Sequence, residues 1–387
     1  MGALKVFVIA GEPSGDALGA ALMAGLTQLS AGVTFQGVGG PLMQEQGLAS
    51  QFDMSELSLM GIAEILPKYR HLKRRIAETA RAVIESKPDV LITIDAPDFS
   101  LRVAKLVKAE STIRTVHYVA PTVWAWRPGR AAKMARVIDH VLALFPFEPP
   151  YMEAAGMDCD FVGHPAANAP RALDAEQADF RTAHGLNKAD PLMLVLPGSR
   201  QGEVARMGPV FGDALRALAL DHPKMQVIVP AAPSVAKAVE ALVATWSVPT
   251  KVIDIRGMEI EAGLAQKRTA FAAADVALAT SGTVALELAA AGTPMVSAFD
   301  FNWITRMIIS RLLITKRSCL INLITDSDVV PEVTGYKFNT ENVVQAVKAV
   351  LADTSTQAAA MERAMDLLGR GGEDPGIRAA RAVLDRL

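Results

Sequence analysis

The chain has 387 residues, which is longer than a single hydrophobic core usually grows, so its length predicts two domains. Its 39 Lys and Arg residues nearly balance 41 Asp and Glu residues, which excludes a global positive field that would attract nucleic acid. The two cysteines, Cys159 and Cys319, lie far apart in a chain without a recognisable signal peptide, which excludes a disulfide scaffold and favours a reducing, cytoplasmic compartment.

Short aliphatic or β-branched segments alternate with helical segments along the whole chain. Such alternation is typical of parallel sheets covered by helices on both faces, so we predict the α/β class. The expected strands are residues 6–10, 34–38, 90–95, 115–119 and 141–145 in the first half, and residues 192–196, 226–230, 251–255, 276–279 and 294–298 in the second. No apolar run reaches the roughly 18 residues of a membrane-spanning helix.

The two sets of strands predict two doubly wound, Rossmann-like domains facing each other across a cleft, with ligands at the carboxyl ends of the strands. Residues 162–190 are polar, contain proline and lack strand character, so we expect the linker there. The predicted domains are residues 1–165 and 166–345. Residues 346–387 are predicted C-terminal helices, and the sequence leaves open whether they cross back to the N-terminal domain.

The first predicted strand leads into a glycine turn, Gly11-Glu12-Pro13-Ser14-Gly15-Asp16. Its acids Glu12 and Asp16 would repel a diphosphate, so we expect a nucleotide to bind in the second half of the chain. An acid-flanked turn suits the hydroxyls of an acceptor sugar, which makes Ser14, Gly15 and Asp16 candidate acceptor contacts. A structural interpretation stays open, with Ser14 as a helix cap and Asp16 in the first helical turn.

The segment at residues 60–75 carries five basic residues against one acid, interleaved with apolar side chains. Each basic residue near an anionic lipid surface contributes about 1 kcal/mol of attraction, so the segment predicts reversible peripheral contact with a membrane. The candidate contacts are Ile62, Ile65, Leu66, Lys68, Tyr69, Leu72, Arg74 and Arg75. Residues 303–317 have a similar character, and either segment could instead be a core helix with a solvated basic face.

The strongest strand of the first half ends in Asp95-Ala96-Pro97-Asp98-Phe99, so both carboxylates would project into the predicted cleft. If the second half of the chain binds a UDP-sugar, transfer of the sugar breaks its glycosidic bond to UDP. The hydroxyl of the acceptor sugar must then lose a proton, which requires a carboxylate within hydrogen-bond reach. Asp98 is the candidate general base. The alternative makes Asp98 the cap of the following helix.

An aromatic cluster follows in the next part of the first half. His117 closes a predicted strand, and Trp124 and Trp126 lie in the proline-bounded loop after it. Aromatic side chains in such a loop suit stacking on a sugar or packing as a lid, so these three residues are candidate acceptor contacts. Core packing is an open alternative for Trp124.

Residues 280–287, Thr-Ser-Gly-Thr-Val-Ala-Leu-Glu, follow an apolar segment and are typical of a tight turn and a helix start. Amides at a helix start hold a diphosphate without many cationic side chains, so Ser281, Gly282 and Thr283 are candidate nucleotide contacts. Glu287 lies one helical turn beyond Thr283 and could accept hydrogen bonds from a ribose diol. A capping box would need its acid at Leu286 instead.

A second turn, Pro197-Gly198-Ser199-Arg200, follows the first strand of the second half. We expect it at the same end of the sheet as Ser281, which makes Gly198, Ser199 and Arg200 candidate nucleotide contacts. The planar guanidinium of Arg200 suits a phosphate or a uracil. The alternative is an ordinary surface arginine at a helix start, where the helix dipole disfavours a cation slightly.

We expect no obligatory metal and no cofactor. The carboxylate pairs in Asp158-Cys159-Asp160 and Asp326-Ser327-Asp328 have the one-residue spacing that metal-dependent sugar transferases use, but neither follows a glycine turn. The chain also lacks a complete dinucleotide fingerprint, a Gly-Lys-Ser/Thr phosphate loop and a serine-hydrolase elbow.

Several of these motifs, taken in order, closely resemble the lipid-A-disaccharide synthase family. They are Gly11 to Asp16, Gly39-Gly40-Pro41, Met60-Gly61-Ile62-Ala63-Glu64, Asp95 to Phe99, Pro121-Thr122-Val123-Trp124-Ala125-Trp126, Gly163-His164-Pro165, Leu196 to Arg200, and Ser281-Gly282-Thr283. The resemblance runs from the first strand to about residue 335, and its specificity comes from the order and number of the motifs.

The resemblance implies a GT-B glycosyltransferase that inverts the anomeric configuration. It would join UDP-2,3-diacylglucosamine to 2,3-diacylglucosamine 1-phosphate (lipid X), giving the β-1,6 lipid A disaccharide 1-phosphate and UDP. It further implies Asp98 as the base, an acceptor contact at Asn322 and a peripheral position at the inner membrane, with a homodimer as a possible assembly. No nucleic acid partner is expected.

Two rival functions stay open at this point. One is a UDP-N-acetylglucosamine transferase that acts on a polyprenyl-linked acceptor, whose first turn would be richer in glycine and carry a histidine, unlike residues 11–16. The other is a non-catalytic module that binds nucleotide and lipid.

Overall fold

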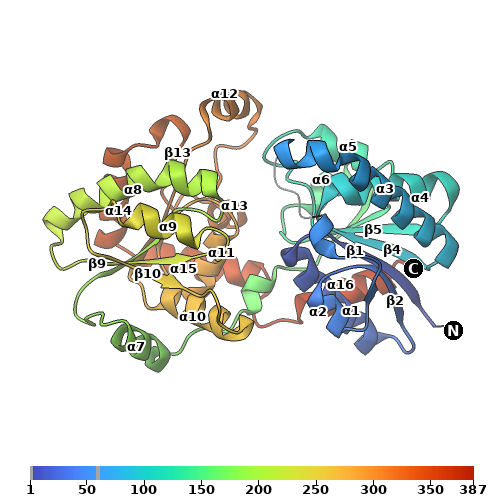
Figure 1. Ribbon diagram of the computed structural model, residues 1–387, viewed down its shortest axis with the longest axis horizontal. Helices are drawn as coiled ribbons and strands as arrows, with labels where there is room; N and C mark the ends of the chain where they lie inside the picture. Colours follow the sequence, from blue (N-terminus) through green and yellow to red (C-terminus); the bar gives the residue numbers. More distant parts are fainter. Residues whose placement is uncertain (1–2, 58–61) are drawn as a thin grey trace. The chain divides into compact units, whose positions relative to one another are not determined.

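The computed structural model describes residues 3–57 and 62–387, and within these ranges it describes all side chains except those of residues 62–69, 304 and 308–311. The chain divides into two compact units. The first comprises residues 1–165 and 371–387, and the second comprises residues 166–370. Both are parallel sheets flanked by helices (Figure 1), which confirms the predicted α/β class.

In the described part of the first unit, seven strands form one sheet in the order β3-β2-β1-β4-β5-β6-β7. Neighbouring strands are parallel throughout. The strands are β1 (Lys5–Ala10), β2 (Thr34–Val38), β3 (Ala49–Ser50), β4 (Val90–Ile94), β5 (Arg114–Tyr118), β6 (His140–Ala143) and β7 (Asp158–Phe161). The helices are α1 (Pro13–Leu29), α2 (Pro41–Glu45), α3 (Ile62–Ser86), α4 (Pro97–Glu110), α5 (Gly129–Met134), α6 (Pro149–Glu153) and α16 (Pro375–Leu384). The five strands expected in this half are all present.

The described part of the second unit has six parallel strands in the order β10-β9-β8-β11-β12-β13. They are β8 (Leu192–Leu196), β9 (Gln226–Ala231), β10 (Thr250–Asp254), β11 (Val276–Ala279), β12 (Met295–Phe299) and β13 (Glu332–Thr334). The helices are α7 (Asp174–Ala183), α8 (Gln201–Asp221), α9 (Ala236–Val243), α10 (Ile260–Ala272), α11 (Val284–Ala291), α12 (Trp303–Leu312), α13 (Leu320–Thr325), α14 (Thr340–Ala352) and α15 (Ser355–Leu367). Short 3-10 turns occur at Met54–Glu56 in the first unit, at Pro165–Asn168 where the chain passes from the first unit to the second, and at Gly335–Lys337 in the second unit.

Each sheet has one point where the strand order reverses, between β1 and β4 in the first unit and between β8 and β11 in the second. Loops that leave the carboxyl ends of such a strand pair diverge to opposite faces, which opens a crevice where ligands of α/β sheets bind. The central strands are fully buried, as in the Val90–Ile94 strand, because helices cover both faces. The topology therefore places a candidate site in each unit.

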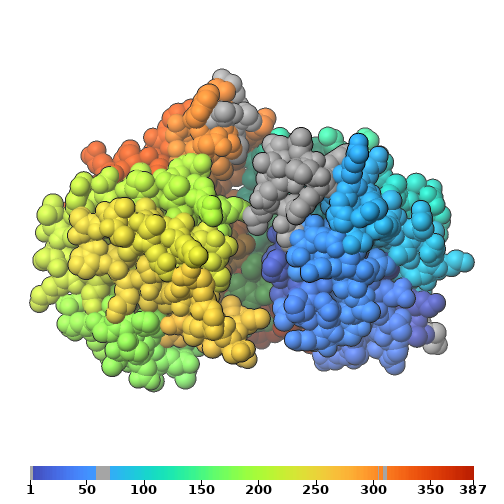
Figure 2. Space-filling model, viewed as in Figure 1, coloured from blue at the N-terminus to red at the C-terminus, as the bar shows by residue number. Residues whose placement is uncertain are grey.

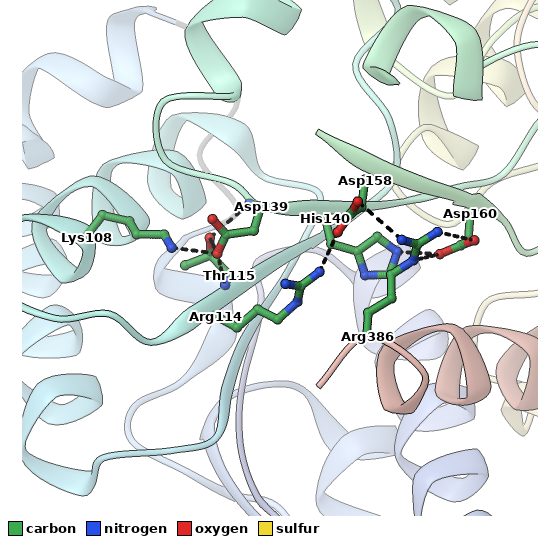
Figure 3. A network of polar contacts seen from close by, with 8 residues as sticks. All are labelled: Lys108, Arg114, Thr115, Asp139, His140, Asp158, Asp160 and Arg386. Atoms are coloured by element: carbon green, nitrogen blue, oxygen red, sulfur yellow. Dashed lines mark hydrogen bonds and ion pairs between the residues drawn. The ribbon is translucent and has the colours of Figure 1, made fainter. Parts of the chain in front are cut away.

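The C-terminal segment belongs to the first unit, where α16 packs against α1. A Cβ atom on Gly25 would lie 2.6 Å from the carbonyl oxygen of Gly376, so glycine is required for the close approach of the two helices. Arg386, just beyond α16, donates to both carboxylate oxygens of Asp160 on β7 at 2.6 and 3.1 Å. His140, on the neighbouring strand, holds the same carboxylate at 2.8 Å (Figure 3).

This network also explains the carboxylate pair that the sequence offered as a metal motif. Asp158 and Asp160 lie on the edge strand β7, where Arg114 donates to Asp158 at 2.6 Å and Arg386 contacts both acids. The acids therefore fasten the end of the chain to the sheet. Among the described residues, no helix is both long and apolar enough to cross a membrane.

Candidate functional site

The second unit contains a cavity of about 590 Å³ at the carboxyl ends of β8, β9, β10 and β11. One part of its lining is polar and follows β8 and β11; the other part is apolar and comes from the ends of β9 and β10 and from α10. The lining residues are Leu196, Gly198, Ser199, Arg200, Glu203, Pro230, Ala231, Ala232, Pro233, Ile253, Ile255, Leu264, Lys267, Phe271, Thr280, Ser281, Gly282, Thr283, Val284 and Glu287. All seven predicted nucleotide contacts are among them.

The turn between β11 and α11 forms the polar floor of the cavity. The Thr280 amide donates to the Leu196 carbonyl at 3.1 Å, and the Ser281 hydroxyl donates to the Ser318 carbonyl at 3.0 Å, which fixes the turn. Gly282 has a φ of 138°, a conformation that side chains other than glycine's strongly disfavour. Helix α11 begins at Val284, and the amides of Ala285 and Leu286 already donate to the carbonyls of Gly282 and Thr283 at 3.2 and 2.9 Å. The amides of residues 282–284 make no such bond within the described structure, so they can hold an anion.

The capping-box alternative does not occur at this helix. Thr283 is the N-cap residue and makes no side-chain capping bond within the described structure. Glu287 instead forms an ion pair with Lys267 of α10, and both side chains line the cavity. The ion pair engages Oε2 of Glu287 and leaves Oε1 without a hydrogen bond within the described structure, so Oε1 is available as an acceptor at the cavity wall.

The turn between β8 and α8 forms the adjoining wall. Gly198 has a φ of 130°, and a Cβ atom there would lie 2.5 Å from the Cβ of Glu203, so both conformation and space require glycine. Arg200 is the N-cap residue of α8 and pairs with Glu203 at 3.1 Å, while the Ser199 amide donates to the other carboxylate oxygen of Glu203 at 3.1 Å. The Arg200 side chain is 67% exposed, which leaves its guanidinium accessible to a ligand.

In the first unit, the turns after β1 and β4 meet at the reversal point of the sheet. Ala10 and Ile94 pair at the strand ends, and a Cβ atom on Gly11 would lie 2.8 Å from the Cβ of Ala96. This contact brings the acidic glycine turn beside the segment that carries Asp98. Two groups of predicted residues therefore lie at one place in the unit.

Asp98 lies in the first turn of α4 and is exposed, with no hydrogen bond to its carboxylate among the described residues. The proposal that it caps the helix is wrong, because α4 begins at Pro97 with Ala96 as its N-cap residue. Asp95 and Ala96 have φ values of 48° and 44°, a left-handed conformation that costs roughly 1–2 kcal/mol per residue. Asp98 follows this strained turn, and its exposed carboxylate is accessible to a ligand.

Of the three candidates in the glycine turn, Ser14 is exposed and Gly15 packs against β1 and β4. Ser14 does not cap α1, because the N-cap residue is Glu12. Asp16 is 3% exposed, and its carboxylate accepts hydrogen bonds from the amides of Gly40, Leu42 and Met43 at 2.9, 3.0 and 3.1 Å. These contacts support the structural interpretation of Asp16, as the group that holds the start of α2.

His117 lies inside the sheet rather than on an open surface. Its side chain is buried, and its Nδ1 lies 2.8 Å from the Thr93 hydroxyl, which itself donates to the Val116 carbonyl at 3.1 Å. Burial lowers the pKa of His117 to about 4, so the ring is neutral near pH 7. These contacts favour a structural role for His117 and give its predicted acceptor contact no support.

The tryptophans belong to an aromatic group beyond β5 and β6. Trp124 packs edge-on against Phe147 at 5.3 Å, Phe147 stacks on Phe145 at 5.5 Å, and Phe145 stacks on His164 at 5.8 Å. Trp126 is half-buried, with its indole under the guanidinium of Arg127 at 4.4 Å. Trp124 therefore packs against other aromatic rings of the unit, as its alternative proposed, although it is half-buried like Trp126.

Glu148 is a buried acid beneath this aromatic group. Its carboxylate accepts hydrogen bonds from the amides of Leu144 and Phe145 at 3.1 and 3.0 Å. Burial raises its pKa to about 8, although the Phe145 amide, the Trp124 indole and the Leu144 amide favour the charged form. The Trp124 Nε1 atom lies near this carboxylate without a hydrogen bond of good geometry to any described residue.

Asn322, in the second unit, is 1% exposed and fully engaged. Its amide nitrogen donates to the Val330 carbonyl and to Glu332, both at 2.8 Å, and its oxygen accepts from the Val330 amide at 3.0 Å. This arrangement clamps the loop between α13 and β13. It favours a structural role and gives the predicted acceptor contact no support.

The predicted membrane contacts Ile62, Ile65, Leu66, Lys68 and Tyr69 have side chains outside the described part of the structure. Leu72 is half-buried and packs against the core, Arg74 is exposed, and Arg75 pairs with Glu56 at 2.8 Å. Membrane contact through α3 stays a prediction. In the second basic segment, Arg306 pairs with Asp300 and Arg317 with Asp326 and Asp328, while Trp303 and Ile314 are exposed.

Comparison with known proteins identifies the family. A family model described as lipid-A-disaccharide synthetase matches residues 6–375. The chain is 60% identical over 384 residues to the lipid-A-disaccharide synthase of Ruegeria pomeroyi, covering 99% of this chain and 96% of the relative, and 44% identical to that of Rhodospirillum centenum, covering 99% and 94%. The chain belongs to the lipid-A-disaccharide synthase family.

Solved structures confirm the GT-B fold expected for this family. An S. aureus MnaA complex with UDP has a TM-score of 0.63 at 13% identity, covering 98% of this chain and 95% of that one. A UDP-GlcNAc 2-epimerase from Neisseria meningitidis bound to UDP-GlcNAc has a TM-score of 0.62 at 11% identity, covering 100% and 99%. MurG of Acinetobacter baumannii has a TM-score of 0.55 at 13% identity and covers 100% of both chains. At these identities the likeness concerns the fold alone.

Sequence reasoning on this family member missed two charged residues of the cavity, Glu203 and Lys267. Glu203 had a local signal, because it lies three residues after the N-cap of α8, where acids commonly hold helix amides. Lys267 had none, since it reaches Glu287 from a different helix. Only the fold brings Lys267 and Glu287 together.

Proposed function

We propose that this chain is an inverting glycosyltransferase that transfers the diacylated glucosamine of UDP-2,3-diacylglucosamine to lipid X, forming the β-1,6 lipid A disaccharide 1-phosphate and releasing UDP. The observation that carries the proposal is the cavity of the second unit, where an amide-lined turn at Ser281, Gly282 and Thr283 adjoins an apolar wall. Membership of the lipid-A-disaccharide synthase family supplies the reaction.

The nucleotide fits this cavity in a definite orientation. The diphosphate binds the amides at the start of α11, where the helix dipole favours negative charge. The uracil occupies the apolar part near Ile253 and Ile255, and the ribose hydroxyls donate to Glu287. Arg200, at the start of α8, contributes a cation beside the diphosphate.

The same groups assist departure of the leaving group. Negative charge grows on the UDP oxygen as the glycosidic bond breaks, and pre-oriented amides stabilise that charge more than water does. A diphosphate that is stabilised in this way leaves without a general acid. The second unit therefore needs to supply electrostatic stabilisation rather than a proton.

The first unit supplies the base. Asp98 removes the proton from the 6-hydroxyl of the acceptor glucosamine as that oxygen attacks the anomeric carbon of the donor, and a single displacement inverts the configuration. Its exposed, unbonded carboxylate supports this assignment. Ser14 and Trp126, which keep accessible polar or aromatic surface, are the proposed acceptor contacts in the same unit.

The acylated substrates require access to a membrane surface, so we propose peripheral association with the cytoplasmic face of the inner membrane through α3. Flotation of the purified protein with anionic vesicles tests this association. The homodimer stays a prediction, which sedimentation of the purified protein tests.

The reaction itself is tested with purified protein, UDP-2,3-diacylglucosamine and lipid X, with EDTA in place of added metal. Mass spectrometry should find the disaccharide 1-phosphate together with UDP. A parallel reaction with UDP-N-acetylglucosamine and a polyprenyl-linked acceptor tests the rival transferase. Product in the second reaction alone would overturn the proposal, and product in neither would favour a non-catalytic module.

A further inference from the structure

Lys267 is a charged residue of the cavity that the reaction described above does not use. It lies on α10, which forms part of the outer surface of the second unit (Figure 2), and its side chain is 32% exposed. Its ammonium group pairs with Glu287 of α11 and lies 5.3 Å from the centroid of the Phe271 ring, one helical turn along α10. The lysine is therefore held from two sides, by a carboxylate and by an aromatic face.

The pair determines where the Glu287 carboxylate points. Glu287 is 41% exposed, and among the described residues Lys267 is the one side chain that forms an ion pair with its carboxylate. A glutamate without such a partner distributes over several rotamers, and each hydrogen bond to a ligand must then overcome that freedom. One ammonium leaves further lone pairs of the carboxylate available, so Glu287 can accept from hydroxyls while it is paired.

The pair also balances the charge of the cavity. The four ionisable residues in the lining are Arg200, Glu203, Lys267 and Glu287, so the two cations are matched by two anions. A nucleoside diphosphate brings several negative charges to this space. Without Lys267, the Glu287 carboxylate would repel the diphosphate bound at the neighbouring helix start.

From this geometry we infer that Lys267 is a positioning residue for the nucleotide: it orients Glu287 toward the ribose hydroxyls and offsets its charge. The inference rests on the proposed function, because it takes Glu287 as the acceptor of the ribose hydroxyls. An exposed ion pair by itself contributes little to stability. The effect of Lys267 should therefore appear in nucleotide recognition rather than in folding.

The test measures binding of UDP, 2′-deoxy-UDP and 3′-deoxy-UDP by calorimetry to the full-length chain. The ribose preference is the ratio of the Kd of a deoxy analogue to the Kd of UDP. Lys267→Met removes the charge and keeps an unbranched side chain against Phe271, and Lys267→Arg restores the charge. Lys348→Met is the matched control, because Lys348 pairs with Asp221 in the same unit outside the cavity.

We expect Lys267→Met to weaken UDP binding about threefold to tenfold and to lower the ribose preference. Lys267→Arg should recover most of both, and Lys348→Met should change neither. Glu287→Gln should also lower the preference, and adding Lys267→Met to it should have little further effect on the preference.

Three other outcomes would overturn the inference. If Lys267→Met keeps the wild-type preference while Glu287→Gln loses it, the inference is wrong and the ribose site stands. If Lys267→Met weakens all three nucleotides equally, the lysine acts on charge alone and does not position Glu287. If Glu287→Gln keeps the preference, the assignment of the ribose to Glu287 in the proposed function fails, and the inference fails with it.

Discussion

The two units place turns at the same topological point and differ in charge there. At the reversal between β1 and β4, the turns carry Glu12, Asp16, Asp95 and Asp98 and no Lys or Arg. At the reversal between β8 and β11, the acids Glu203 and Glu287 are each paired with a cation, Arg200 and Lys267. The sheet topology therefore places both candidate sites, and the side chains that follow the strand ends give the two sites different charges.

The largest expected effect concerns Asp98, the proposed base beside the acidic turn. Asp98→Asn should lower the transfer rate by roughly 10²–10⁴-fold, since general base catalysis contributes about that much. The Kd of UDP should stay within about twofold, because the proposed nucleotide site lies in the other unit. Steady-state kinetics and calorimetry on the same preparation check both statements. An unchanged transfer rate would remove Asp98 from the mechanism.

The next effect concerns the amide turn of the second unit. Gly282→Ala should weaken UDP binding by at least roughly tenfold, because a φ of 138° costs a side-chain-bearing residue about 1–3 kcal/mol and the turn would shift. The control is Gly202→Ala in α8, where a Cβ also has open space but φ is not positive. If both variants bind UDP equally well, the special conformation of this turn is unimportant.

A third prediction separates structure from recognition within the acidic turn. Asp16→Asn should lower the free energy of unfolding of the first unit by roughly 1–3 kcal/mol, because the buried carboxylate accepts hydrogen bonds from the Gly40 amide before α2 and from two amides within α2. Ser14→Ala, two residues away and exposed, should leave it nearly unchanged. Denaturant unfolding measures both. If Asp16→Asn raises the KM of the acceptor without loss of stability, the structural interpretation of Asp16 is wrong.

The last effect is a pH dependence of the first unit, which appears only when the pH is lowered below about 6.5. The pKa of His117 falls from 6.5 to about 4 because the folded unit buries it, so between these values the unfolded chain binds a proton that the folded unit excludes. The free energy of unfolding should therefore decrease as pH is lowered from about 6.5 to about 4, by up to about 3 kcal/mol from this residue.

His117→Asn, which keeps a polar partner for Thr93, should make this pH dependence shallower without abolishing it, because burial also lowers the pKa of His164 in the same unit to about 4. His222→Gln in the second unit should leave the slope of the first unit unchanged. Denaturant unfolding at several pH values measures the slopes. Equal slopes for the His117 variant and the wild type would show that His117 does not carry the effect.

The strands that the sequence predicted were predictable for one physical reason. Central parallel strands are buried on both faces, so they are continuous apolar runs, and all ten expected strands occur at or within two residues of their predicted positions. The strands that were not predicted, β3, β7 and β13, lie at sheet edges. Edge strands carry polar residues such as Asp158 and Asp160, whose partners are distant in the sequence.

The residues of the candidate sites divide in the same way, into those that local sequence predicts and those that depend on distant partners. The glycine turns and Asp98 were predictable because they come directly after apolar strands, and the topology brings strand ends together. The roles of Asp16, His117 and Asn322 were not, because each is determined by a tertiary partner: the amides at the start of α2, the Thr93 hydroxyl, and the loop before β13. Lys267 was missed for the same reason.

Hydrogen exchange with and without UDP tests the central claim most directly, because it reports which turn binds the nucleotide. We expect slower exchange of the amides at residues 281–284 when UDP is added, with the amides at residues 11–16 unchanged. Protection of residues 11–16 without protection of residues 281–284 would contradict the account.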